Sequence, residues 1–115
     1  MRDLDALRDA LRAFSAERDW DQFHSPKNLA MALSVEAAEL LEIFQWMNEA
    51  DSRNLDPAAR AAASDEVADV LLYLVRLADR LGIDPIEAAR RKMADNARRY
   101  PVGKSRGTSR KSTEP

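Results

Sequence analysis

The chain has 115 residues, a net charge of −2 and no cysteine, so we expect a single domain without disulfides or thiolate metal ligands. No apolar run approaches the roughly 18 residues that a membrane-spanning helix needs, and the charged N-terminus does not resemble a signal peptide. We therefore expect a cytoplasmic protein without a membrane partner. Residues 101–115 carry +3, which leaves −5 on residues 1–100, a charge that disfavours specific nucleic-acid binding.

Proline and glycine divide the chain into four predicted helical segments. The first covers about residues 3–18, where large apolar residues recur every three or four positions. The second begins at the "SP" of residues 25–26, a cap followed by proline, and runs to about residue 48. The third runs from the "DP" of residues 56–57 to about residue 81, where Gly82 suits a left-handed helix end. The fourth begins at the "DP" of residues 84–85, where Asp84 and Glu87 have the spacing of a capping box, and runs to about residue 100.

These segments predict an all-α fold, a four-helix bundle that occupies residues 1–101. Three glycines and few β-branched residues argue against a sheet. Residues 102–115 are rich in glycine, serine and basic residues and lack apolar side chains after Val102, so they predict a disordered basic tail. The apolar surface of the two long central helices is wide enough that we expect a second copy of the chain to cover part of it, in a homodimer or homotetramer.

An acidic pair interrupts the apolar stripe of each central helix. Glu36 and Glu39 lie one turn apart among leucines and alanines in the second segment, and Glu66 and Asp69 repeat this spacing in the third. Glu42, by contrast, lies toward the polar flank of its helix. If the two stripes face each other, four carboxylates converge at one point of the bundle.

Buried carboxylates that lack partners are costly, and a cation would neutralise them. Oxygen ligands without cysteine or histidine favour Mg²⁺, with Mn²⁺ as a substitute. The alternative is that arginines pair with the acids across the bundle; the available ones are Arg76, Arg80, Arg90 and Arg91. The repetition of the pair on two helices favours the metal site. Di-iron chemistry and P-loop chemistry are disfavoured because the Glu-x-x-His pairs and the glycine-rich phosphate loop are both absent.

Three longer stretches of the sequence resemble a known protein family. The stretches "ERDWDQFHSPKNLAMALSVEAAELLEIFQW", "DEVADVLLYLVRLADRLGID" and "KMADNARRYP" resemble the all-α nucleoside triphosphate pyrophosphohydrolases, the MazG-like proteins, and most of all their dCTP pyrophosphatase branch. The resemblance covers about residues 4–101. It implies a Mg²⁺-dependent helical enzyme that assembles as a dimer or tetramer and cleaves a nucleoside triphosphate between its α- and β-phosphates. Such a reaction gives a nucleoside monophosphate and pyrophosphate.

The resemblance also implies roles for individual residues. The metal ligands would be Glu36, Glu39, Glu66 and Asp69. The residues around the nucleotide would be Trp20, His24, Asn28, Trp46 and Tyr73. The residues that help to hold the phosphates or the sugar would be Lys92, Asn96, Arg99 and Tyr100.

This assignment agrees with elementary chemistry. Water activated at the metal would attack phosphorus. We expect Glu39 to assist that water, with Glu36 as the second catalytic candidate, although any of the four acids could serve. Cationic side chains, Lys27 among them, would stabilise negative charge on the phosphates. The faces of Trp20 and Trp46 would stack on a base, although core packing is the simpler role for an indole.

One position departs from the family pattern. The dCTP-preferring branch is expected to place a histidine in the first helix beside the base, and Leu11 stands at that position here. The base preference is therefore open, and related or modified pyrimidine deoxynucleotides are candidate substrates for a house-cleaning role. The competing hypothesis is a non-catalytic helical module in which the acidic pairs are salt-bridged or hold a structural cation.

Overall fold

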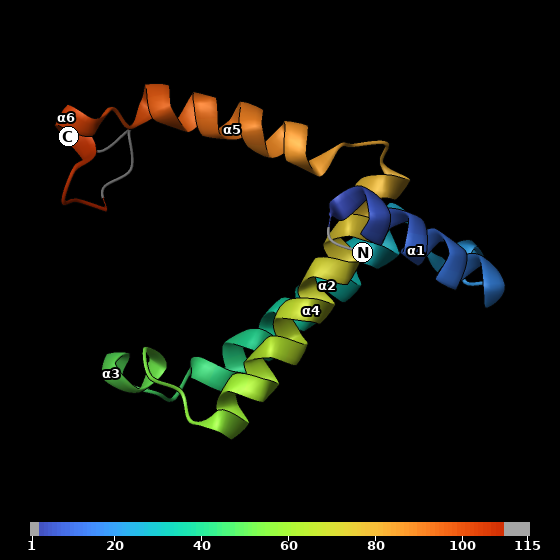
Figure 1. Ribbon diagram of the computed structural model, residues 1–115, viewed down its shortest axis with the longest axis horizontal. Coiled ribbons are helices and arrows are strands. Elements are labelled where there is room, and N and C mark those ends of the chain that lie inside the picture. Colours follow the sequence, from blue (N-terminus) through green and yellow to red (C-terminus); the bar gives the residue numbers. More distant parts are fainter. Residues whose placement is uncertain (1–2, 110–115) are drawn as a thin grey trace. The chain divides into compact units, whose positions relative to one another are not determined.

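The structure is a computed structural model that describes residues 3–109, and all regular secondary structure within this range is helical (Figure 1). The longer helices are α1 (Leu4–Glu17), α2 (Pro26–Phe44), α4 (Pro57–Arg80) and α5 (Pro85–Arg99). The shorter ones are the 3-10 turn η1 (Asp21–Phe23), α3 (Glu49–Ser52) and α6 (Val102–Ser105). The all-α prediction is thus confirmed, and each of the four predicted segments contains one of the longer helices.

The helix starts follow from local side-chain chemistry. Ser25 Oγ accepts a hydrogen bond from the Asn28 backbone N–H at 3.1 Å, which caps α2. Asp56 caps α4 and Asp84 caps α5 in the same way, and each of these three caps is followed by proline at the first helical position. The predicted caps are therefore confirmed.

The predicted end of the second segment is wrong by several residues. The helix α2 ends at Phe44 and the chain turns; the side chain of Asn48 then accepts a hydrogen bond from the Asp51 N–H and so starts the short helix α3. The third segment, by contrast, ends as predicted: α4 is followed by Gly82 with φ of 68°, in the left-handed region that glycine tolerates.

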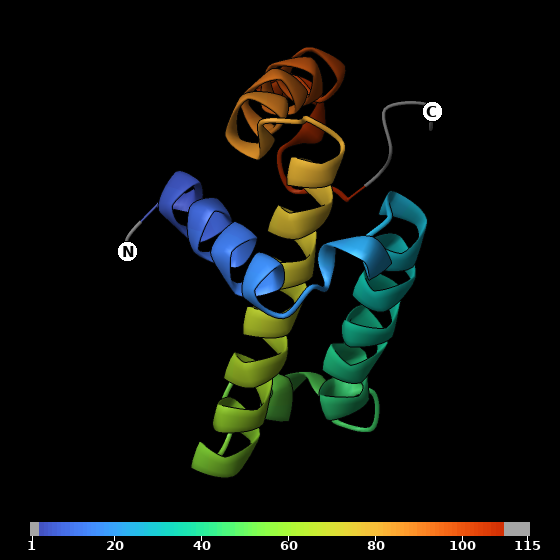
Figure 2. The ribbon, with the colours of Figure 1, turned by 90° about the vertical axis from the view of Figure 1, so that its right-hand side faces the viewer.

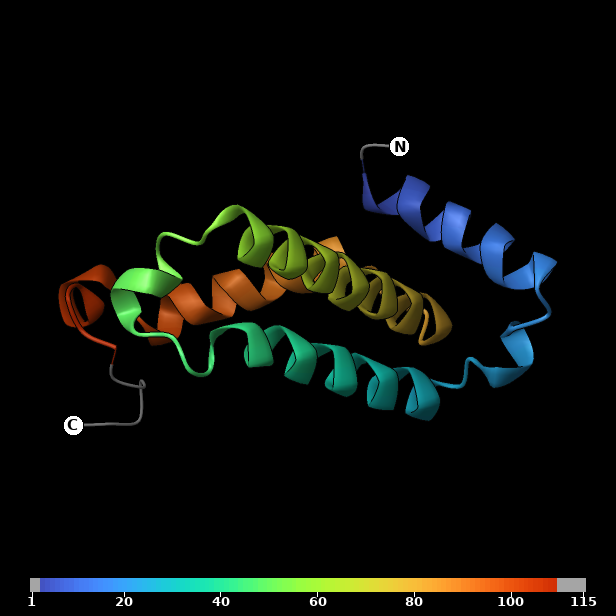
Figure 3. The same ribbon diagram turned by 90° about the horizontal axis from the view of Figure 1, so that it is seen from below.

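The chain forms two compact units, residues 1–82 and residues 83–115. In the first unit, α2 and α4 run in opposite directions side by side, and α1 packs against α4 (Figures 2 and 3). The buried apolar residues among the described ones are Leu29, Val75 and Ala78, so the core of this unit lies between α2 and α4, near the contact with α1. Arg12 Nε donates to Asp79 Oδ2 at 2.8 Å and ties α1 to α4.

The second unit consists of α5 and the segment after it. Its helix α5 is capped at the C-terminal end by Tyr100, whose backbone N–H donates to the Asn96 carbonyl at 2.8 Å, and α6 follows. Part of the predicted basic tail, residues 110–115, lies outside the described residues, and the domain boundaries proposed from the sequence stay a prediction. No helix within residues 3–109 has both the length and the apolar composition that a bilayer crossing requires.

Candidate metal centre and adjoining cavity

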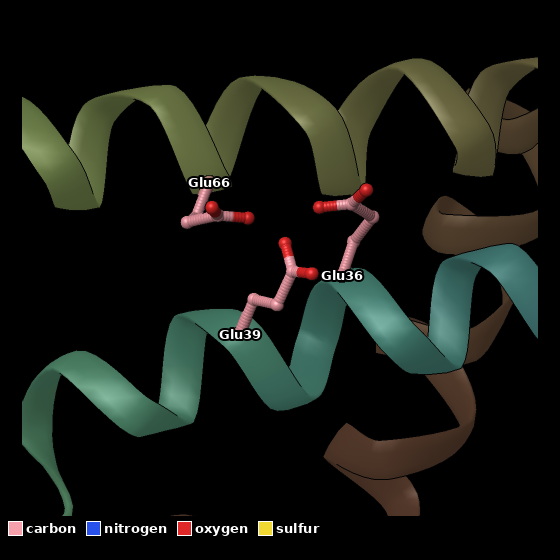
Figure 4. A group of neighbouring side chains, drawn as sticks. All are labelled: Glu36, Glu39 and Glu66. Atoms are coloured by element: carbon pink, nitrogen blue, oxygen red, sulfur yellow. The ribbon is translucent and has the colours of Figure 1, made fainter.

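Three of the four predicted acidic ligands meet between α2 and α4. Glu36 and Glu39 project from successive turns of α2 toward Glu66 on α4 (Figure 4), and the three carboxyl groups each offer an oxygen within 4.8 Å of the others. The opposed, antiparallel stripes of the two helices bring these groups together. The spacing of the acidic residues predicts this convergence for two stripes that face each other.

Two of the three carboxyl groups hold an oxygen that is cut off from solvent. Glu36 Oε2 and Glu66 Oε2 are buried and have no hydrogen-bond partner. Such atoms are rare in folded proteins because their desolvation is costly when nothing compensates for it. The predicted alternative, pairing with arginines, is not what the structure contains, because no ion pair within residues 3–109 includes either residue. These orphaned oxygens fit a bound cation.

The electrostatics of the cluster point in the same direction. The nearby carboxyl group of Glu66, with which a protonated Glu36 can share its proton, raises the pKa of Glu36 above its ordinary value of 4.5, and burial adds to the shift. Hydrogen bonding to Glu36 likewise raises the pKa of Glu39, and the negative charge of Glu36 adds to it. Repulsion between the negative charges adds to both shifts, so without a cation the cluster retains protons. A divalent cation would offset the same charge.

The fourth predicted ligand, Asp69, lies one turn beyond Glu66 on α4. It is not a member of the close group of three, although its negative charge contributes to the raised pKa of Glu36. Asp69 instead lines an adjoining cavity of about 160 Å³. Its assignment as a metal ligand stays a prediction, and its position connects the acidic cluster to the cavity.

The cavity gathers several of the predicted nucleotide-binding residues. Its lining residues are Leu11, Phe14, Ser15, Trp20, His24, Leu29, Asp69, Leu72, Tyr73 and Arg76. The ring of Trp20 lies edge-on to Phe14, at 5.6 Å between centroids, and edge-on to His24, at 6.3 Å. Leu11, which stands where the family pattern predicts a histidine, also lines this cavity. We call this space the base-side cavity.

Other predicted residues lie outside this cavity. Trp46 is 90% exposed in the turn after α2. Lys27 and Asn28 are exposed in the first turn of α2, and the Asn28 side chain donates to the Phe23 carbonyl at 3.1 Å, which joins the 3-10 turn to the helix. The structure thus gives Asn28 a local structural contact, and the proposed nucleotide contacts of these three residues stay predictions.

The predicted phosphate and sugar residues all belong to the second unit. Lys92, Asn96 and Arg99 lie on α5, and Tyr100 is its C-terminal cap. The Arg99 guanidinium lies over the Tyr100 ring, 5.8 Å from its centroid. Their roles toward a nucleotide stay predictions.

Sequence reasoning missed Arg76 as a member of the site. It is 5% exposed, its Nε donates to His24 Nδ1 at 3.1 Å, and a terminal nitrogen pairs with Asp21. In the sequence, Arg76 is only one of several cations that could neutralise the acids. The signal that could have found it is its register on α4, seven residues beyond Asp69 and three beyond Tyr73.

The chain is similar in sequence to several known proteins. A model of the MazG-like family matches residues 31–114. The chain is 46% identical over 113 residues to dCTP pyrophosphatase 1 of Rattus norvegicus, an alignment that covers 96% of this chain and 66% of the rat protein. The Homo sapiens protein of the same name is also 46% identical, with the same coverage. The chain therefore spans about two thirds of the length of these relatives.

A solved structure shares the fold. A pyrophosphatase from Archaeoglobus fulgidus DSM 4304 superposes with a TM-score of 0.76 at 46% sequence identity, covering 84% of this chain and 91% of that one. At this identity the likeness extends beyond the fold to the sequence itself.

Proposed function

Because the chain belongs to the MazG-like family, we propose that it is a Mg²⁺-dependent nucleoside triphosphate pyrophosphohydrolase that acts on dCTP or related, including modified, pyrimidine deoxynucleotides. The relatives named dCTP pyrophosphatase 1 and the structural neighbour named a pyrophosphatase support nucleotide pyrophosphatase activity. The observation that carries the proposal is the pair of orphaned buried oxygens of Glu36 and Glu66 beside a cavity with aromatic walls. The reaction would yield a nucleoside monophosphate and pyrophosphate and remove unwanted nucleotides from the pool.

The residues of the cluster would hold the ion. Glu36, Glu39 and Glu66 are the ligands that the geometry supports best, with Asp69 next in line. When bound, Mg²⁺ supplies Lewis-acid polarisation of phosphate oxygens and offsets the charge of both the carboxylates and the triphosphate.

Side chains of the protein would orient the attacking water and remove its proton. A carboxylate of the cluster, for which we propose Glu39, orients the attacking water and takes its proton as the water attacks the α-phosphorus. The base-side cavity adjoins the cluster through Asp69, so a base lodged between Trp20 and Tyr73 would direct the triphosphate toward the acidic cluster. Leu11 makes one wall of this cavity apolar where a histidine would be polar, which favours contact with carbon atoms of the base.

Incubation with triphosphates tests the activity. We expect dCTP and its 5-substituted analogues, in the presence of Mg²⁺, to give the monophosphate and pyrophosphate in equal amounts, and chelation of the metal to stop the reaction. Ion-exchange chromatography of the products, with a series of pyrimidine and purine triphosphates, measures both the cleaved bond and the base preference. Release of orthophosphate from a fresh triphosphate would contradict the assigned bond, and no turnover of any triphosphate would refute the enzyme assignment.

We also propose that the chain forms a homodimer or homotetramer. Only three apolar side chains are buried within residues 3–109, whereas apolar residues on α2 and α4 stay exposed; they include Met31, Val35, Val67, Leu71 and Leu74. Those on α4 recur at helical spacing and so form a stripe, which a second copy would cover. Light scattering should give the mass of two or four chains, and Leu74→Lys should shift the mass toward one chain. A single-chain mass for the unmodified protein would contradict the proposal.

A further inference from the structure

The imidazole of His24 is held on one edge by an arginine. Arg76 Nε donates to His24 Nδ1 at 3.1 Å, and Ser15 Oγ lies 3.5 Å from the same nitrogen. Both Arg76 and Ser15 are buried, at 5% and 2% exposure, although both are polar. An arrangement of buried polar groups around one ring nitrogen fixes that ring more firmly than a surface contact would.

The donor capacity of arginine determines the tautomer. An arginine side chain carries N–H donors and no acceptor, so the nitrogen that it contacts must accept. Nδ1 of His24 therefore carries no proton, and the ring's one N–H is on Nε2, on the opposite edge. Burial and the positive charge of Arg76 also lower the pKa of His24, which keeps the ring neutral.

Arg76 itself is fixed by carboxylates on two sides. One terminal nitrogen pairs with Asp21 of the 3-10 turn, and the other lies 3.5 Å from Asp79, one turn along α4. Asp79 is in turn held by Arg12 of α1. The guanidinium is thus fixed by carboxylates of η1 and α4, the second of which is itself held from α1, and its Nε is left to orient the histidine.

We propose that Arg76 is a positioning residue that fixes His24 as the Nε2–H tautomer, so that the ring offers a hydrogen-bond donor to the occupant of the base-side cavity. The inference rests on the proposed function and deepens it. An Nε2–H donor selects a group that accepts, such as a carbonyl oxygen or an unprotonated ring nitrogen of a nucleobase. The rest of the wall is mostly aromatic and aliphatic, so this polar contact would fix the orientation of the base.

The tautomer is measurable without any substrate. His24 is the only histidine in the chain, so a long-range ¹H–¹⁵N correlation spectrum of the labelled protein contains one imidazole. We expect Nδ1 to resonate as an unprotonated nitrogen and Nε2 as a protonated one at neutral pH. A spectrum with Nδ1 protonated, or with both nitrogens protonated, would overturn the assignment. The unmodified protein alone decides this point, so a poorly folding variant does not remove the test.

Kinetics of triphosphate hydrolysis test the role of the tautomer. Arg76→Met removes the donor, and we expect it to mix the tautomers and raise KM about tenfold while kcat changes by less than about threefold. Arg76→Lys restores a donor and should recover most of the lost affinity and the Nε2–H spectrum. The matched control is Arg80→Met, which removes a positive charge one turn further along α4. Arg80 Nε donates at 3.0 Å to the backbone carbonyl of His24 and not to a ring nitrogen.

The outcomes separate the two proposals. If the tautomer is as expected but Arg76→Met leaves KM unchanged, or Arg80→Met raises it equally, the positioning role is refuted and the pyrophosphohydrolase assignment stands. If the unmodified protein hydrolyses no triphosphate, the proposed function fails, and the ¹⁵N spectrum still decides the tautomer. The proposal is supported if KM rises above that of the unmodified protein in Arg76→Met, returns toward it in Arg76→Lys and is unchanged in Arg80→Met.

Discussion

Replacement of Glu39 by glutamine is expected to lower kcat/KM for triphosphate hydrolysis at least about 100-fold, the scale on which a positioned proton acceptor contributes. The amide keeps the size of the side chain, but it has lost the negative charge that attracts a cation and the basicity that receives a proton. Steady-state kinetics with saturating Mg²⁺ measure the loss, and circular dichroism shows whether the helices are retained. The non-catalytic alternative predicts no activity to lose.

The chain offers a matched control for this substitution in Glu42→Gln. Glu42 lies one turn beyond Glu39 on α2, is exposed, and is not a member of the acidic cluster. The control removes the same charge from the same helix, so its activity should stay within about twofold of the unmodified enzyme. Equal losses in both variants would show that helix charge, rather than the cluster, supports catalysis.

The second large effect is expected on stability, in the absence of metal. Glu36 and Glu39 bind protons more tightly in the folded chain than at their ordinary pKa of 4.5. Their contribution to stability is therefore full below pH 4.5 and is lost as the pH rises through the raised folded values. Thermal unfolding in a chelator should show a Tm that falls from about pH 5 toward neutrality. Mg²⁺ at roughly 100 times its Kd should raise the Tm at pH 7 by on the order of 10 °C.

The substitution Glu36→Gln separates the pH dependence caused by the acidic cluster from the titration of the rest of the chain. Glu36→Gln removes one charge from the cluster, so in chelator it should be more stable at pH 7 than the unmodified chain, with a weaker decline as the pH rises. It should also gain less from Mg²⁺. A metal-free protein whose Tm is equal at pH 5 and pH 7, and unaffected by Mg²⁺, would contradict the assignment of a cation to the cluster.

Much of the fold follows from local sequence. The caps Ser25, Asp56 and Asp84, each followed by proline, fix three helix starts, because a side-chain oxygen can satisfy the free N–H groups of a first turn wherever the chain places it. The predicted end of α2 is wrong because the apolar pattern continues past Phe44, whereas the cap formed by Asn48 starts a new helix. The spacing of apolar residues alone does not show whether the helix continues past Phe44 or a new helix begins at Asn48, because that outcome depends on the backbone geometry of the turn.

The sequence by itself determined the all-α class and the acidic pairs, since helical spacing puts Glu36 beside Glu39 on one face before any packing occurs. The tertiary structure decided which carboxylates meet: Glu66 joins the two glutamates of α2, whereas Asp69 lines the base-side cavity. It also decided the role of Arg76, which forms hydrogen bonds to His24, 52 positions earlier in the chain, and to Asp21, 55 positions earlier. The physical reason is that hydrogen-bond partners and burial depend on how helices pack, and residues distant in sequence become neighbours only in the folded chain.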